Sequence, residues 1–143
     1  MISSSDFRLP KSPLRAGALI LAATSYIAVG VAHFTHEDFF LSIMPPYLPA
    51  PLWLVWISGI FEVLGGLGLL YLPSRLFASR GLVALLVAVY PANIHMALNA
   101  EEFASEGYEP WTLYARLPFQ FVFIAWALWV GRPDTPSSAE QQD

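Results

Sequence analysis

Four long apolar blocks dominate this chain and decide the solvent in which it can fold. They run over residues 14–34, 51–72, 76–98 and 110–130. A helix needs about 20 apolar residues to cross the roughly 30 Å of hydrocarbon in a bilayer. Only 13% of the 143 residues are charged, whereas an ordinary soluble domain carries about 25%. The blocks therefore predict an all-α integral membrane four-helix bundle over residues 14–130.

Two other interpretations of the blocks were weighed. A soluble four-helix bundle would keep a polar stripe on each helix, whereas these blocks are apolar on nearly every face. The first block follows Arg8, Lys11 and Arg15, as a secretory signal would. However, its uncharged run from Ala16 to Ala32 is longer than the roughly 7–15 residues of a signal core. We therefore expect a retained span.

Basic residues gather on one side of the predicted membrane. Six of the seven flank the first block, the turn between blocks two and three, or the end of block four: Arg8, Lys11, Arg15, Arg75, Arg80 and Arg132. The two opposite loops carry only acidic charges: Glu37, Asp38, Glu101, Glu102, Glu106 and Glu109. Because positive loops stay inside, we expect both termini to be cytoplasmic. The charge distribution lacks the basic footprint of a nucleic-acid-binding protein.

The remaining segments are short. Residues 1–13 are expected to form a cytoplasmic N-terminal segment, and residues 131–143 a disordered cytoplasmic tail, because they are polar and rich in turn formers. Four prolines between residues 41 and 53 predict a stiff, extended connector. The chain has no cysteine, which excludes disulfides and dithiol chemistry by its own residues.

Glu62 is the one carboxylate in the middle of an apolar block. An unpaired charge there costs at least about 2.5–3.5 kcal/mol. Arg116 and Gln120 share one face of the fourth block, and counting residues places Arg116 roughly 7 Å nearer the outer boundary than Glu62. We therefore predict a direct or water-bridged ion pair between Glu62 and Arg116, with Gln120 beside it.

Other polar side chains fall in the same outer half. Asn93 and His95 follow a proline in the third block, and Tyr26 and His33 share a face of the first block. One interpretation is a buried hydrogen-bond network that fixes the helix register. The other is a ligand or proton site, since ionisable groups within membranes are commonly functional. For His33 a wet position near the boundary is the simpler reading.

The sequence offers two further candidate sites, a metal site and a dimer contact. His33, His36 and Glu37 lie close in sequence, and His95 could add a third nitrogen. Their spacing matches neither H-E-x-x-H nor H-x-x-E-H, so we expect no metal. The glycines of residues 59–68 fit either close packing within the bundle or a small-xxx-small dimer contact.

The order "GVAHF", "MPPYLPAPLWLVWISGIFEVLGGLGLL", "VYPANIHMALN" and "ARLPFQ" closely resembles the DoxX-like family of small four-helix bacterial membrane proteins. The resemblance covers about residues 30–129. It implies a membrane protein associated with redox complexes in some relatives, among them a subunit of a thiosulfate–quinone oxidoreductase. The matching positions are Glu62, Asn93, Arg116 and Gln120. Dithiol-linked branches of the family need cysteines, which this chain lacks.

Two functions follow from these features. The first is an accessory or scaffold component of a membrane redox or envelope complex, without catalytic activity of its own. Its partners would be the lipid bilayer and either a redox protein or further copies of this chain. The alternative is a small membrane protein that binds a quinone or another lipid-soluble ligand and exchanges protons at Glu62 or His95.

Overall fold

A computed structural model describes residues 4–134, and over that range it contains helices and no strand. The long helices are α1 (Pro13–Thr35), α3 (Pro51–Leu70), α4 (Arg75–Leu98) and α6 (Pro110–Gly131). All four are long and apolar enough to cross a membrane. Their ends agree with the four predicted blocks to within two residues, which confirms the all-helical prediction.

Proline explains several of these helix starts. It occupies the first turn of α1, α3 and α6, where its fixed φ suits the helix and its missing N–H costs nothing. The Ser12 side chain also accepts a hydrogen bond from the Arg15 backbone N–H at the start of α1, as an N-cap residue does.

Short helices occupy the connections between the long ones. They are η1 (Ser4–Phe7), α2 (Glu37–Ser42), η2 (Leu72–Ser74) and α5 (Ala100–Ser105). The connector between α2 and α3 spans residues 43–50 and forms turns and bends, not the extended segment predicted there. Pro45, between them, is buried. The predicted tail lies mainly at 135–143, outside the described residues.

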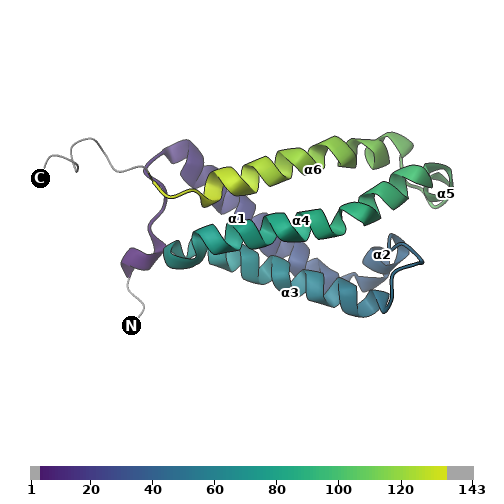
Figure 1. The fold of residues 1–143 in the computed structure, drawn as a ribbon, viewed down its shortest axis with the longest axis horizontal. Helices are drawn as coiled ribbons and strands as arrows, with labels where there is room; N and C mark the ends of the chain where they lie inside the picture. The colour runs from purple at the N-terminus through teal and green to yellow at the C-terminus, as the bar shows by residue number, and fades with distance from the viewer. Residues whose placement is uncertain (1–3, 135–143) are drawn as a thin grey trace, which may run out of the picture.

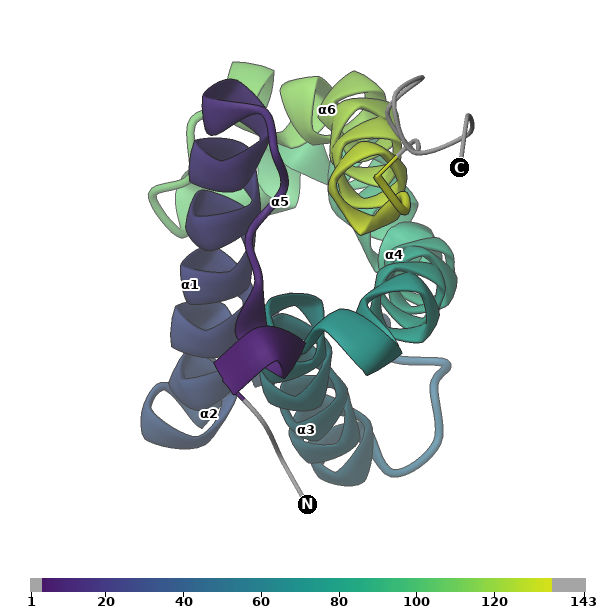
Figure 2. The ribbon, with the colours of Figure 1, turned by 90° about the vertical axis from the view of Figure 1, so that its left-hand side faces the viewer.

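The four long helices form an incomplete ring. In it, α1 packs on α3, α3 on α4, and α4 on α6, whereas α1 and α6 contact each other much less. In Figure 1, α1 begins beside the C-terminal end of α6 and crosses obliquely to the side of α3. Figure 2 shows the four helices arranged around a common axis. Helices α1 and α6 thus diverge toward the end that carries α2 and α5.

At the opposite end of the bundle, the segments near both ends of the described chain contact the long helices. The buried Arg75 side chain donates from Nε to the Leu69 carbonyl at 2.8 Å and from Nη2 to the Arg8 carbonyl at 2.7 Å. Arg15 Nη1 lies 2.9 Å from Asp134 Oδ1. These contacts tie the segments that flank α1 and α6 to the bundle.

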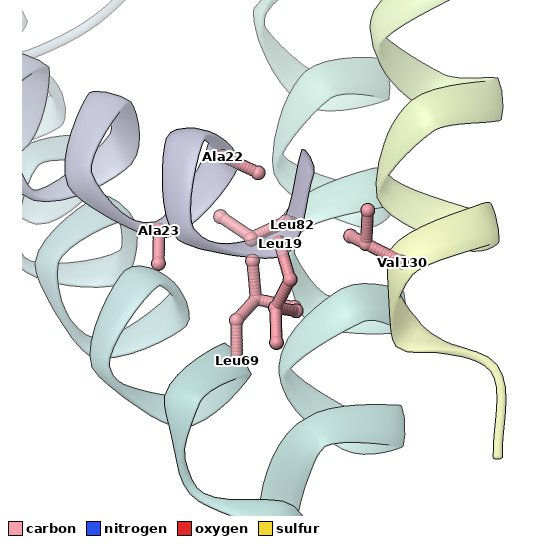
Figure 3. Close-up of a cluster of buried hydrophobic side chains, with 6 residues drawn as sticks. All are labelled: Leu19, Ala22, Ala23, Leu69, Leu82 and Val130. Carbon is pink, nitrogen blue, oxygen red and sulfur yellow. The ribbon is translucent and has the colours of Figure 1, made fainter. Parts of the chain in front are cut away.

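Two apolar clusters close the bundle at its two ends. The first lies near the termini and is drawn in Figure 3: Leu19, Ala22, Ala23, Leu69, Leu82 and Val130. The second lies near α5: Met96, Ala100, Phe103 and Leu113. The space between the clusters is left to polar side chains and cavities.

Candidate functional site

Glu62 lies on α3 and faces α1. Its Oε2 atom is 3.4 Å from His33 Nδ1, is buried, and has no hydrogen-bond partner. His33 Nδ1 instead donates to the Val29 carbonyl at 2.9 Å. Because a carbonyl can only accept, this contact assigns the Nδ1–H form to the imidazole. The His33 ring stacks on the ring of Phe40 in α2, and the two ring centroids are 3.7 Å apart.

Two cavities meet at Glu62. The first, of about 320 Å³, has walls from all four long helices: Ala22, Ser25, Tyr26, Val29, Glu62, Leu86, Phe123 and Trp126. The second, of about 170 Å³, lies toward α2 and is lined by Glu62, His33, Phe40, Ser58 and Asn93 among others. We call the first cavity the Glu62 cleft. It is mostly apolar, and Glu62 supplies its charge.

A second polar group lies between α4 and α6. Asn93 Nδ2 donates to Gln120 Oε1 at 3.1 Å, and Gln120 Nε2 donates to the Leu86 carbonyl. That carbonyl lies beside the one that Pro91 leaves without its helical partner. The Gln120 side chain is buried. From the sequence, both residues were expected in the polar outer half of the bundle, and the structure adds the hydrogen bond between them and the backbone acceptor.

Arg116 belongs to this second group and does not pair with Glu62. Its Nη1 atom approaches Met96 Sδ at 3.5 Å, and no ion pair joins it to any carboxylate among residues 4–134. The predicted direct ion pair with Glu62 is therefore wrong. Residue counting gave a difference in depth, but it could not show that α1 passes close to α3 and places His33 beside Glu62.

His95 lies apart from both groups. It contacts Asn99, whose Nδ2 is 3.2 Å from His95 Nδ1, and its ring meets Tyr47 and Phe103 edge-on. The expected grouping of His95 with Glu62 is not seen. Within the described range, no three His, Asp or Glu side chains come close enough to hold a metal ion.

Several residues of the site were not expected from the sequence. Phe123 and Trp126 form the α6 wall of the Glu62 cleft, and Phe40 covers His33. Their signal was weak, because an aromatic residue in an apolar helix is ordinary. Phe123 does follow Arg116 and Gln120 at helical spacing, so extending that stripe by one turn would have found it.

The arrangement can hold a ligand and exchange a proton with it. A carboxyl group in an apolar cavity donates a hydrogen bond when protonated and accepts one when ionised. Aromatic walls and a few polar groups are typical of small-molecule sites of 300 Å³ or more. The fold and the site together define a class of protein. It is a small bundle of four helices, each long and apolar enough to span a membrane, around a mostly apolar cavity that contains one carboxyl group.

The comparisons with known proteins place the chain in a family. The family model described as a domain of unknown function, DUF8561, matches residues 21–131. The match runs from within α1 to the last residue of α6 and includes Glu62, His33, Asn93, Arg116 and Gln120. The chain therefore belongs to this family. No curated protein and no solved structure matches it.

Proposed function

We propose that the chain is a multi-pass protein of a bacterial cytoplasmic membrane, with both termini on the cytoplasmic side. Four span-type helices support this. So does the position of six of the seven basic residues, which flank the ends of the long helices opposite to α2 and α5. The resemblance to DoxX-like proteins points the same way. In this setting the gap between α1 and α6 faces the lipid.

Within that membrane, we propose that the Glu62 cleft binds a lipid-soluble small molecule, with a quinone as the leading candidate. The observation that carries this is Glu62 Oε2, which is buried beside the cavity and has no hydrogen-bond partner. A buried polar atom without a partner costs roughly 1–3 kcal/mol, and a ligand oxygen would satisfy it. Tyr26, Phe123 and Trp126 offer aromatic walls for a flat ring.

These residues fit a quinone by their chemistry. When bound, a quinone takes up and releases electrons together with protons. Glu62 holds a proton at the ligand oxygen or receives one from it. His33, whose Nδ1–H is directed to the Val29 carbonyl, lies on the α2 side of Glu62 and leaves the carboxyl free to bond to the ligand. The apolar walls exclude water from the ring.

The test uses fluorescence quenching by a short-chain quinone in lipid nanodiscs. We expect saturable quenching that is lost in Trp126→Phe and kept in Trp129→Phe, since Trp129 does not line the cleft. Ser25→Phe should block binding, because Ser25 lines the cleft and is exposed. Ala28→Phe on the same helix should not. Glu62→Gln should weaken binding about tenfold, as expected for one lost hydrogen bond to a charged or acidic group.

Quenching that rises linearly with quinone and is equal in all variants would contradict the ligand site. A scaffold role in a redox or envelope complex is then favoured by a second observation. Polar side chains of the bundle also donate to backbone carbonyls of neighbouring helices, as Ser79 does to Ala127 at 2.8 Å and Gln120 to Leu86. Such bonds hold helices together in lipid.

A further inference from the structure

Arg116 is a cation in a span-type helix without a charged partner among the described residues. It follows Pro110, the first residue of α6, by six positions, which is about 9 Å along the helix axis. Its hydrogen bond runs from Nη1 to the Met96 thioether at 3.5 Å, and a thioether is a weak acceptor. In a bilayer a guanidinium with only this partner is costly, so the position calls for an anion.

The side chain lines a cavity of about 570 Å³ along α6, which we call the Arg116 groove. Leu86 and Asn93 of α4 form one wall, and the α6 residues are Trp111, Thr112, Ala115, Arg116, Phe119, Gln120 and Phe123. The amides of Asn93 and Gln120 bond to each other and to the Leu86 carbonyl. Arg116 is therefore the charged group that lines the groove, and its guanidinium retains unused donors. Phe119 and Phe123 continue the groove as an apolar track.

The end of the bundle at which α6 begins carries the opposite charge, although no carboxylate among the described residues lines the groove itself. Glu109 directly precedes α6, is exposed, and makes no side-chain capping bond. Glu101 and Glu102 of α5 lie at the same end of the bundle and are exposed too. A ligand that fits this order of charges has an anion at the level of Arg116, a cation nearer the surface, and an apolar chain that points inward.

We propose that the Arg116 groove binds one zwitterionic phospholipid, a phosphatidylethanolamine from the outer leaflet. The planar guanidinium of Arg116 pairs with the phosphate through two parallel N–H···O hydrogen bonds, because this bidentate geometry matches arginine to phosphate. The ammonium group lies toward Glu109, and an acyl chain runs along Phe119 and Phe123. The site rests on the membrane insertion proposed above. It differs from the Glu62 cleft in its charged group, although Leu86 and Phe123 line both cavities.

The test is native mass spectrometry of the protein released from nanodiscs that hold equal amounts of phosphatidylethanolamine and phosphatidylglycerol. We expect one retained phosphatidylethanolamine per chain. Arg116→Gln should lower its retention at least about tenfold, as expected for a lost charge-assisted bond. Arg80→Gln removes an exposed cation at the other end of the bundle and should change nothing.

Two further variants sharpen the result. Ala115→Phe fills the groove and keeps the charge, so it should also abolish retention, and it tests the site even where Arg116→Gln does not fold. Glu109→Gln should reduce the preference for phosphatidylethanolamine over phosphatidylglycerol. Equal retention of the two lipids, a preference for phosphatidylglycerol, or equal retention by wild type and Arg116→Gln would each overturn the proposal. Quinone quenching at Trp126 reports on the Glu62 cleft independently.

Discussion

A close approach of the α1 and α3 backbones at two facing glycines gives the sharpest stability prediction. A Cβ atom added to Gly30 of α1 would lie 2.8 Å from the Gly59 carbonyl oxygen and 2.9 Å from the Val63 backbone nitrogen. One added to Gly59 would lie 2.8 Å from the Gly30 carbonyl oxygen and 2.7 Å from His33 Cβ. Ordinary van der Waals contact begins at 3.4 Å. Because backbone atoms cannot rotate away, α1 and α3 must separate to admit either methyl group.

We therefore expect Gly30→Ala and Gly59→Ala each to lower the free energy of unfolding by about 1–3 kcal/mol, the usual cost of overpacking. Gly17→Ala on α1 is the matched control, because a Cβ there meets nothing within 4 Å. Alanine is the better helix former, so this control should be neutral or stabilising by up to about 1 kcal/mol. The double variant Gly30→Ala/Gly59→Ala should cost less than the sum, since one separation of the helices relieves both clashes.

The measurement is reversible unfolding in mixed detergent micelles, followed by tryptophan fluorescence and helical circular dichroism as the fraction of denaturing detergent rises. The reasoning would be refuted if Gly30→Ala and Gly59→Ala unfolded at the same detergent fraction as Gly17→Ala. That result would mean that α1 and α3 do not touch at these glycines, and the placement of His33 beside Glu62 would fall with it.

Two further predictions concern the polar residues and the topology. In double-mutant cycles, Glu62→Gln and His33→Leu should couple by about 0.5–3 kcal/mol, as neighbours do, whereas the losses from Glu62→Gln and Arg116→Gln should add within about 0.5 kcal/mol; the reverse pattern would restore the Glu62–Arg116 pair. Cysteine at Ser105 should react with an impermeant thiol reagent in intact cells, and cysteine at Ser138 should not, as positive-inside topology requires. Labelling of Ser138→Cys alone would invert the proposed orientation.

The sequence was sufficient for the long helices because their signal is local. An apolar block of about 20 residues that begins at a proline or after a charge predicts its own ends, and α3 begins at Pro51 as expected. The short helices α2 and α5 were not predicted. The prolines of the first connector and the acidic residues of the second indicated loops. Each is six residues long, too short for helical periodicity to register.

The site was predicted only in part, for a geometric reason. Asn93 and Gln120 were both expected in the polar outer half of the bundle, because each lies on a polar stripe of its own helix, and adjacent stripes at equal depth tend to meet. The partner of Glu62 was not predicted, because it depends on where α1 crosses α3. That crossing is set by Gly30 and Gly59, and nothing in the sequence of either helix alone shows which residues face each other across it.

The distribution of tight and loose contacts explains why cavities remain between these helices. Helices α1 and α3 pack closely because glycines face each other across their contact. Helices α4 and α6 pack closely at Gly131, where an added Cβ would collide with Ser79. Between α1 and α6 stand the large side chains of Phe123 and Trp126. A bundle that needed its polar groups only to fix register would be expected to bring its two opposite charges together. Here Glu62 and Arg116 instead border different, adjoining cavities. Each side chain has bonding capacity left over, and that arrangement favours two ligand sites over one structural ion pair.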